Sequence, residues 1–303
     1  MELITKVDIA GPQKRLSYKN KMMIVGSCFA NEVGAILKSY SFDISINPFG
    51  TLYNPVSILN SLERMNGNLP FDSADIVDIS LHSTEGAAQP QKGASKGDNN
   101  ARYCSFAHHS SFARESGGEF LKYANEQLAE ASAAFKECDT IIITLGTSWV
   151  FRHIPSGKIV SNCHKITPKE FKREFLSCDE TSALFNNFIA RHPDKNFIFT
   201  VSPIRHLKDG AHGNQISKSS LLLAIEKILK TNPHNTYYFP AYEIVLDELR
   251  DYRFYAEDMV HPSEVAVKYI FEKFKEHCID EQSYSEMARN LKAYKQENHR
   301  RLL

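Results

Sequence analysis

The chain lacks the features that mark several classes of protein. No stretch approaches the ~20 consecutive apolar residues that a membrane-spanning helix needs, and the N-terminus carries no apolar signal segment. Basic and acidic side chains balance at 36 each, whereas a nucleic-acid-binding protein needs a basic excess. These absences predict a cytoplasmic protein whose partners include neither a membrane nor a nucleic acid.

The spacings of disulfide scaffolds and metal sites are missing as well. The six cysteines are scattered, with no CxxC pair, which disfavours a disulfide framework or a structural zinc ion. The twelve histidines include no HExxH motif, so we expect no catalytic metal. With 42% hydrophobic and 24% charged residues, the composition is that of an ordinary globular protein.

Apolar runs of strand length alternate with helical periodicity along the chain. Strands are predicted at residues 22–25, 42–46, 139–145, 196–201 and 236–239. Helices are predicted at residues 29–40, 55–65, 119–137, 169–192 (mostly helical), 217–231, 263–277 and 281–303. This alternation predicts an α/β protein with a mostly parallel sheet of about five strands, covered on both faces. Ligands of such sheets bind at the carboxyl ends of the strands.

One region offers almost nothing to bury. Residues 84–101 are rich in Gly, Ser, Gln and Asn, and we expect a mobile surface insertion there. No internal repeat or clear linker divides the remainder. We therefore expect a single domain over residues 1–303 that ends in a polar helical tail at 281–303.

The first candidate site is Gly26-Ser27-Cys28, directly after the first predicted strand. A turn into a helix places the next side chain over the helix N-terminus, where backbone N–H groups are unpaired and the potential is positive. A thiol there loses its proton more readily, and an oxyanion finds donors. Alternatively, Gly26 only makes the turn and Ser27 caps the helix.

Two further strand ends carry candidate residues. Asp258 and His261 lie three apart on a predicted turn, so the His can carry a proton while the Asp fixes its tautomer. The alternative is a helix cap followed by a solvated histidine. The segment 146–149 follows a buried strand and contains the only tryptophan, Trp149, which can equally be an aromatic packed beside a turn.

The order of these segments resembles the SGNH/GDSL hydrolase superfamily. Within it, the letters of Gly26–Ala30 resemble the family named after that pentapeptide, GSCFA. Other segments that look like this family are NPFG at 47–50, HSSF at 109–112, GTSW at 146–149, NCHK at 162–165, SPIRH at 202–206 and DMVHPS at 258–263. The resemblance spans roughly residues 20–275 and implies a three-layer α/β/α, flavodoxin-like fold with ester or acyl chemistry.

The resemblance also implies a nucleophile and a base. Counting from Gly26, Cys28 stands at the nucleophile position, whereas Ser27 takes that role if the turn is rotated by one residue. His261 matches the superfamily base and Asp258 its partner. Because thiols ionise more easily than alcohols, a Cys–His pair needs less help from the Asp.

Oxyanion donors follow from the same resemblance. They are expected to be the backbone N–H of Cys28, Gly50 in the second motif and Ser148 in the third. The superfamily has Asn where this chain has Ser148. A Ser hydroxyl is shorter than a carboxamide, so we expect a weaker or differently built oxyanion hole.

Several residues are expected to contact the substrate. Arg205 and His206 follow the fourth strand, and Arg suits carboxylates and phosphates; alternatively they belong to a surface ion pair. His109, Ser111 and Trp149 are expected to line the same cleft.

Two other histidines are not expected to act in catalysis. His108 is expected to be exposed. Adjacent residues in an extended segment point apart, so Cys163 and His164 are expected to be structural or substrate-lining.

We therefore expect a hydrolase or an acyltransferase, acting on a small-molecule or carbohydrate ester and needing no cofactor for hydrolysis. Two alternatives remain from the sequence. One is a non-catalytic binding module on the same fold. The other is a phosphate-binding protein of the flavodoxin type, which the absence of a GxGxxG motif or P-loop disfavours.

Overall fold

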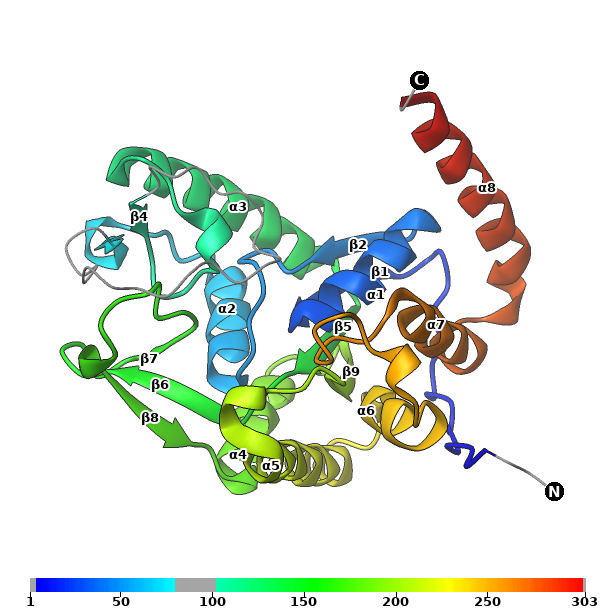
Figure 1. The fold of residues 1–303 in the computed structure, drawn as a ribbon. Coiled ribbons are helices and arrows are strands. Elements are labelled where there is room, and N and C mark those ends of the chain that lie inside the picture. Colours follow the sequence, from blue (N-terminus) through cyan, green and yellow to red (C-terminus); the bar gives the residue numbers. More distant parts are fainter. Residues whose placement is uncertain (1–3, 80–101, 302–303) are drawn as a thin grey trace.

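The computed structural model describes residues 4–79 and 102–301 of the chain (Figure 1). The insertion predicted at residues 84–101 lies outside these described residues. Within them, no helix combines the length and the apolar content that crossing a bilayer requires.

A five-stranded parallel sheet forms the centre of the protein (Figure 1). In spatial order its strands are β10 (Thr236–Tyr238), β9 (Asn196–Val201), β5 (Thr140–Leu145), β1 (Lys21–Gly26) and β2 (Asp43–Ile46). The chain adds strands first on one side of β1 and then on the other, so β1 and β5 flank the topological switch point of a doubly wound sheet. The predicted parallel sheet is confirmed.

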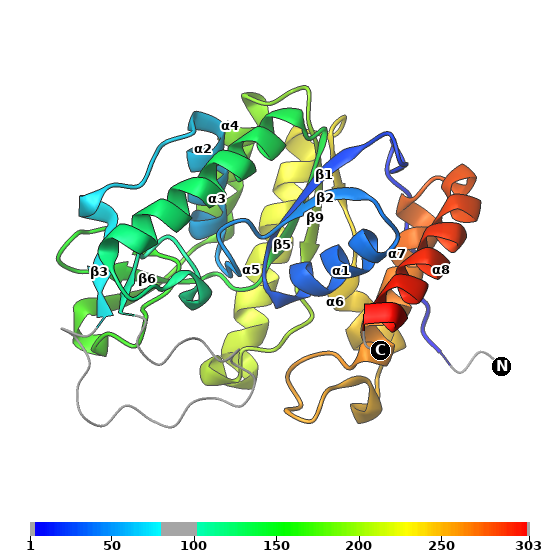
Figure 2. The same cartoon turned by 90° about the horizontal axis from the view of Figure 1, so that it is seen from above.

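Helices cover both faces of this sheet (Figure 2). They are α1 (Cys28–Ser39), α2 (Pro55–Gly67), α3 (Gly117–Glu137), α4 (Cys178–Ala190), α5 (Gly210–Thr231), α6 (Ala241–Glu243), α7 (Glu264–Cys278) and α8 (Tyr284–Arg301). Short 3₁₀ turns lie at Ser73–Asp75, Ser110–Phe112, Pro168–Glu170, Leu207–Asp209, Tyr252–Phe254 and Glu281–Ser283, and a π turn at Ile244–Glu248.

The central strands alternate their side chains between two cores. On β1, Met23 and Val25 pack into the cluster formed with α2, α3, α4 and α5. Met22 and Ile24 pack into the cluster formed with α1, α6 and α7. Both faces are apolar, which is why the strand reads as a continuous hydrophobic run rather than as alternation, and the result is a three-layer α/β/α fold.

A small antiparallel sheet corrects one predicted helix. Its strands are β6 (Trp149–His153), β7 (Ile159–Val160) and β8 (Phe171–Phe175). The helix predicted over 169–192 is wrong at its start, because residues 171–175 pair with β6 and α4 begins only at Cys178. Aromatic rings pair at both ends of β8: Phe175 lies against Trp149 and Phe171 against His153, with ring centroids 5.0 and 5.5 Å apart.

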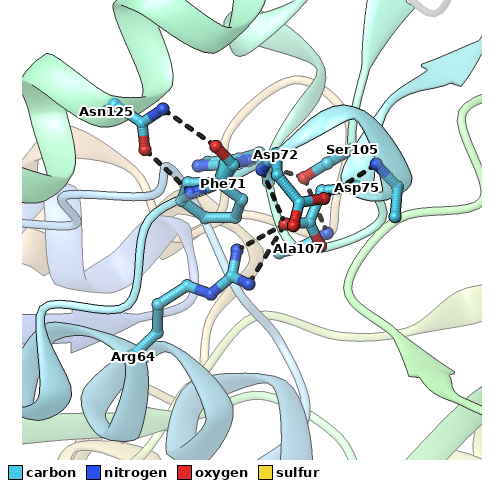
Figure 3. A network of polar contacts seen from close by, with 9 residues as sticks. Arg64, Phe71, Asp72, Asp75, Ser105, Ala107 and Asn125 are labelled. Atoms are coloured by element: carbon cyan, nitrogen blue, oxygen red, sulfur yellow. Dashed lines mark hydrogen bonds and ion pairs between the residues drawn. The ribbon is translucent and has the colours of Figure 1, made fainter.

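A polar network fixes the chain between α2 and the short β3–β4 pair, Val77–Asp78 and Tyr103–Cys104 (Figure 3). The Arg64 guanidinium donates to Oδ2 of Asp75 at 3.1 and 3.2 Å and lies 3.8 Å above the Phe71 ring. The Asn125 carboxamide accepts from the N–H of Phe71 at 2.8 Å and donates to its carbonyl at 3.0 Å. The segment after α2 is thereby tied to both α2 and α3.

Candidate active site

The turn from β1 into α1 depends on Gly26. Its φ is +138°, and a Cβ at this position would lie 2.1 Å from the carbonyl oxygen of Thr144 on β5, so only glycine fits. The N–H of Ser27 donates to the same carbonyl at 3.1 Å. Cys28 is then the first residue of α1, where backbone N–H groups have no intrahelical partner and the local potential is positive.

An asparagine pair locks the loop after β2 onto this turn. Asn47 accepts from the N–H of Gly26 at 2.8 Å and donates to Oδ1 of Asn31 at 2.6 Å. Asn31 in turn donates to the Thr51 hydroxyl at 3.2 Å, and the N–H of Leu52 donates to the Gly26 carbonyl at 2.9 Å. These bonds carry the chain past the end of β1 and bring the next residue, Tyr53, beside Cys28.

Tyr53 is a site residue that the sequence analysis missed. Its phenol oxygen lies 3.5 Å from the Cys28 sulfur in a hydrogen bond, and its ring meets that of His206 edge-on, with centroids 6.2 Å apart. Burial and the neighbouring Cys28 raise the pKa of Tyr53, so the phenol keeps its proton at neutral pH. The available signal was its position, directly before Asn54, the N-cap of α2 whose side chain accepts from Ser57.

Asp258 and His261 form a hydrogen-bonded pair on the loop before α7. Nδ1 of His261 lies 2.6 Å from Oδ2 of Asp258. The backbone N–H groups of His261 and Val260 donate to Oδ1 at 3.0 and 2.9 Å. These hydrogen bonds, with the backbone of His261 contributing most, lower the pKa of Asp258 to about 2. An ionised Asp258 favours the proton on Nδ1 and leaves Nε2 as the proton acceptor.

The two halves of the site meet in one cleft of about 1020 Å³ at the carboxyl ends of the central strands. Cys28 and Tyr53 line it together with Asp258 and His261. The N–H of Arg205 donates to the Val260 carbonyl at 3.3 Å, which joins the segment after β9 to the histidine loop. In the described part of the chain the Cys28 thiol bonds to Tyr53, and no hydrogen bond joins it to the His261 ring.

The structure separates the two candidate nucleophiles. Cys28 faces the cleft, whereas Ser27 is 1% exposed and is absent from the cleft wall. The Ser27 hydroxyl has no hydrogen-bond partner among the described residues. Ser27 occupies the N-cap position of α1, but its side chain makes no capping bond.

Two of the three expected oxyanion donors are not available in this structure. The N–H of Gly50 donates to the Asn47 carbonyl at 2.7 Å, closing a turn. Ser148 is fully buried, its hydroxyl donates to the Ser217 carbonyl at 3.0 Å, and its N–H donates to the Ser217 hydroxyl at 2.8 Å. Ser148 thus anchors α5. Neither residue lines the cleft, which leaves the N–H of Cys28 at the helix start.

His109 and His108 are neighbours in the sequence, but only His109 lines the cleft. Burial lowers the pKa of His109. Ser111, expected beside it, bonds to its ring at 3.1 Å but does not line the cleft. The expectation that His108 is exposed is wrong: it is fully buried, stacked on Phe112 with centroids 4.3 Å apart, and burial lowers its pKa to about 3.

Cys163 and His164 have different surroundings, but the segment is not extended as expected: His164 lies in a turn with a φ of +48°. Cys163 lines the cleft, whereas His164 is buried and its Nε2 bonds to the Ser105 carbonyl at 2.8 Å. The pair therefore offers the cleft a thiol without an adjacent imidazole.

The remaining cleft wall is aromatic and cationic. Trp149, Arg205 and His206 line it. Burial lowers the pKa of His206 to about 4, with the positive charge of Lys218 acting in the same direction, so this imidazole is neutral at pH 7. The Arg173 guanidinium lies 4.0 Å above the Trp149 ring and forms an ion pair with Asp209.

A buried lysine that the sequence analysis missed lies beneath this wall. Nζ of Lys218 donates to the carbonyls of Gly146 and Ser202, both at 2.7 Å. It is 1% exposed, and burial lowers its pKa to about 7. Lys218 therefore ties together the segments that follow β5 and β9.

The fold and site define a doubly wound α/β protein with a cysteine–tyrosine contact and a histidine–aspartate pair in one cleft at the strand ends. The model of the GSCFA family matches residues 21–274, and the chain belongs to this family. No curated protein matches the chain.

Solved structures resemble the chain only in part. One is the structure of a putative platelet activating factor from Streptococcus pneumoniae, at 11% identity and a TM-score of 0.41, covering 86% of this chain and 84% of that one. Another is an acetyl xylan esterase (Est2A) from the rumen bacterium Butyrivibrio proteoclasticus, at 11% identity and a TM-score of 0.35, covering 87% of this chain and 65% of that one.

Proposed function

We propose that this protein is an SGNH-like hydrolase or acyltransferase that attacks ester or acyl groups with the Cys28 thiolate. The observation that carries the proposal is the meeting of Cys28 with the His261–Asp258 pair in one cleft, although the two segments lie at opposite ends of the family region. A thiol at a helix start, an imidazole base and an ionised orienting carboxylate are the parts that nucleophilic catalysis requires.

The chemistry follows from these groups. His261 Nε2 takes the thiol proton, and the Cys28 sulfur forms a bond to the carbonyl carbon while the π electron pair moves to the oxygen. The tetrahedral intermediate collapses as the C–O bond to the leaving alcohol breaks, and His261 returns the proton to that oxygen. Water, or an acceptor hydroxyl in a transferase, then gives its proton to His261 and displaces the sulfur from the thioester.

The side chains that line the cleft favour a polar substrate. Trp149 lines the wall with the Arg173 guanidinium 4.0 Å above its ring. Arg205 offers hydrogen-bond donors, and the neutral His206 ring adds a polar edge. We therefore infer an acylated carbohydrate or a small anionic ester as the substrate, with His109 as a further contact. A reducing compartment, the cytoplasm, keeps such a thiol in its active form.

A non-catalytic binding module is the second candidate. It is favoured by the bond of the Cys28 thiol to Tyr53 rather than to His261 and by the burial of Ser148 away from the cleft. In that case the cleft would bind the same class of ligand without turning it over.

Acyl trapping distinguishes the two candidates. The full chain is treated with p-nitrophenyl acetate, and intact-mass and peptide mass spectrometry locate the adduct. We expect one acetyl group on Cys28 in the wild type, none on this peptide in Cys28→Ala, and retained acetylation in the matched control Ser27→Ala. Acetylation slowed at least about a hundredfold in His261→Ala is expected from the loss of a general base.

A wild-type protein that binds the ester without acetylation of Cys28 would establish the binding module instead. Acetylation that persists in Cys28→Ala and disappears in Ser27→Ala would move the nucleophile to the serine.

A further inference from the structure

The tetrahedral intermediate on Cys28 needs more than one hydrogen-bond donor, and the described chain commits two of the expected ones elsewhere. The Gly50 N–H closes a turn on Asn47, and Ser148 anchors α5 through Ser217. Only the N–H of Cys28 is left at the start of α1. A second donor within reach of the sulfur is therefore required if the proposed function, on which this inference rests, is correct.

We propose that the Tyr53 phenol is this donor and hence a catalytic residue. Its oxygen is 3.5 Å from the Cys28 sulfur, the atom to which the reacting carbonyl carbon would be bonded. The oxyanion, one bond beyond that carbon, forms next to the sulfur and so within reach of a phenol already in contact with it. Among the described residues the phenol has no hydrogen-bond partner other than this thiol, so nothing has to be broken elsewhere when it turns to the oxyanion.

The backbone holds Tyr53 in position for this role. Its carbonyl accepts from the N–H groups of Gly146 and Thr147 at 2.9 and 3.1 Å. A Cβ on Gly146 would lie 2.9 Å from that carbonyl oxygen, so glycine permits the close approach. The loops that follow β2 and β5 are thus joined at Tyr53, and donors fixed in advance avoid the reorganisation that water would need.

The phenol donates a hydrogen bond without losing its proton. Burial and Cys28 both raise the pKa of Tyr53, which keeps the O–H intact while the sulfur is a thiolate. As the C–S bond forms, the π pair moves to the oxygen, and the O–H shifts its hydrogen bond from sulfur to that oxygen. The leaving alcohol takes its proton from His261, so Tyr53 keeps its own proton through each catalytic cycle.

The test compares two reactions of the same thiol. Acetylation by p-nitrophenyl acetate passes through an oxyanion, whereas alkylation by iodoacetamide displaces iodide at a saturated carbon and forms none. Both rates are measured at Cys28 across pH in the wild type, in Tyr53→Phe and in the control Tyr18→Phe. Tyr18 also uses its hydroxyl in a hydrogen bond, to the Tyr40 carbonyl, but lies outside the cleft.

We expect Tyr53→Phe to slow acetylation by about a hundredfold to a thousandfold, the usual loss for one oxyanion donor. Alkylation at pH values where the thiol is fully ionised should be nearly unchanged, and an unchanged midpoint of urea unfolding shows separately that the variant is folded. Tyr18→Phe should alter neither rate.

Three results would overturn the inference. Equal losses in both reactions, with the alkylation pH profile displaced, would make Tyr53 a group that only stabilises the thiolate. Unchanged acetylation in Tyr53→Phe would remove it from the reaction while leaving the proposed function intact. No acetylation of Cys28 in the wild type, with alkylation still occurring, would remove the proposed function and this inference together.

Discussion

Gly26 decides where the candidate nucleophile stands. Its φ is +138°, and a Cβ added here would lie 2.1 Å from the Thr144 carbonyl oxygen. Without a Cβ, the end of β1 can turn into α1 close against β5. A single methyl group at this position would have to displace backbone of the central strand. The placement of Cys28 therefore depends on a residue that has no functional group.

We predict that Gly26→Ala destabilises the protein by about 3 kcal/mol or more, because strain at positive φ and a backbone clash combine. Urea unfolding of the variant measures this change. Gly118→Ala is the matched control: Gly118 is the second residue of α3 with nothing within 4 Å of its Cβ, so alanine there should change the free energy of unfolding by less than about 1 kcal/mol. Equal stabilities of wild type and Gly26→Ala would contradict the steric argument.

Sequence motifs pointed to three residues of the candidate site but did not point to Tyr53. Cys28, Asp258 and His261 were singled out as candidates because each stands in a recognisable short pattern, although the last two lie on the loop before α7 rather than at a strand end. Tyr53 was not, since its relevance arises from a loop that Asn47 and Leu52 fasten to β1.

Between elements, Lys218 joins α5 to the ends of β5 and β9. Its two hydrogen bonds go to the carbonyls of Gly146 and Ser202, which come directly after β5 and β9 and are not paired in the sheet. Both segments continue into the wall of the cleft. In the sequence this lysine lies in a polar stretch at residues 215–220 and reads as a solvated side chain. Its burial follows only from how α5 crosses the strand ends.

We predict that Lys218→Met lowers the free energy of unfolding at pH 7 by about 1–3 kcal/mol, because two buried carbonyls lose their donor. The folded-state pKa of Lys218, about 7, lies below the unfolded value of 10.5. The unfolded chain therefore binds more protons between these values, and this group's contribution to stability rises with pH there.

Denaturant titrations at pH 7, 8 and 9 test this sign. The stability difference between wild type and Lys218→Met should grow as the pH rises. A difference that stays constant over this range would show that the lysine remains fully charged in the folded protein.

The antiparallel sheet β6–β8 shows the limit of prediction at the same scale. Helical character was predicted through residues 171–175, yet these residues pair with β6. Their partner strand lies some twenty residues earlier, and cross-strand aromatic contacts such as Trp149 with Phe175 outweigh local helix propensity. The helix start at Ser177, whose side chain forms a capping box with Glu180, was visible in the sequence as S-x-x-E.

At the scale of the whole molecule, the switch point of the sheet creates the cleft. The chain leaves β1 and β5 toward opposite faces, which opens space at their carboxyl ends. Segments after β1, β2, β5 and β9 and before α7 all reach this space. Arg205 lies here with no side-chain ion pair among the described residues.

We predict that Arg205→Met raises KM about 10-fold to 100-fold for esters that carry a carboxylate or phosphate, the loss expected for a hydrogen bond to a charged group. KM for a neutral ester of similar size should stay within a factor of about two, since no charged hydrogen bond is lost. Arg191→Met serves as the control, because this arginine pairs with Glu63 away from the cleft. Equal changes in KM for charged and neutral esters would argue against an anion contact.

The amino-acid sequence by itself determined the alternation of strands and helices and the parallel sheet, because these follow from periodicity, and its short motifs singled out Cys28, Asp258 and His261 as candidates. Only the tertiary structure decided that Ser27, Gly50 and Ser148 are turned away or committed elsewhere, and that a tyrosine stands beside the sulfur. The physical reason is that these outcomes depend on contacts made in the folded chain. The Gly50 N–H closes a turn on Asn47 within one loop, whereas Ser148 bonds to Ser217 of α5 and Tyr53 contacts Cys28. The last two contacts join different segments and exist only once the crossovers have packed.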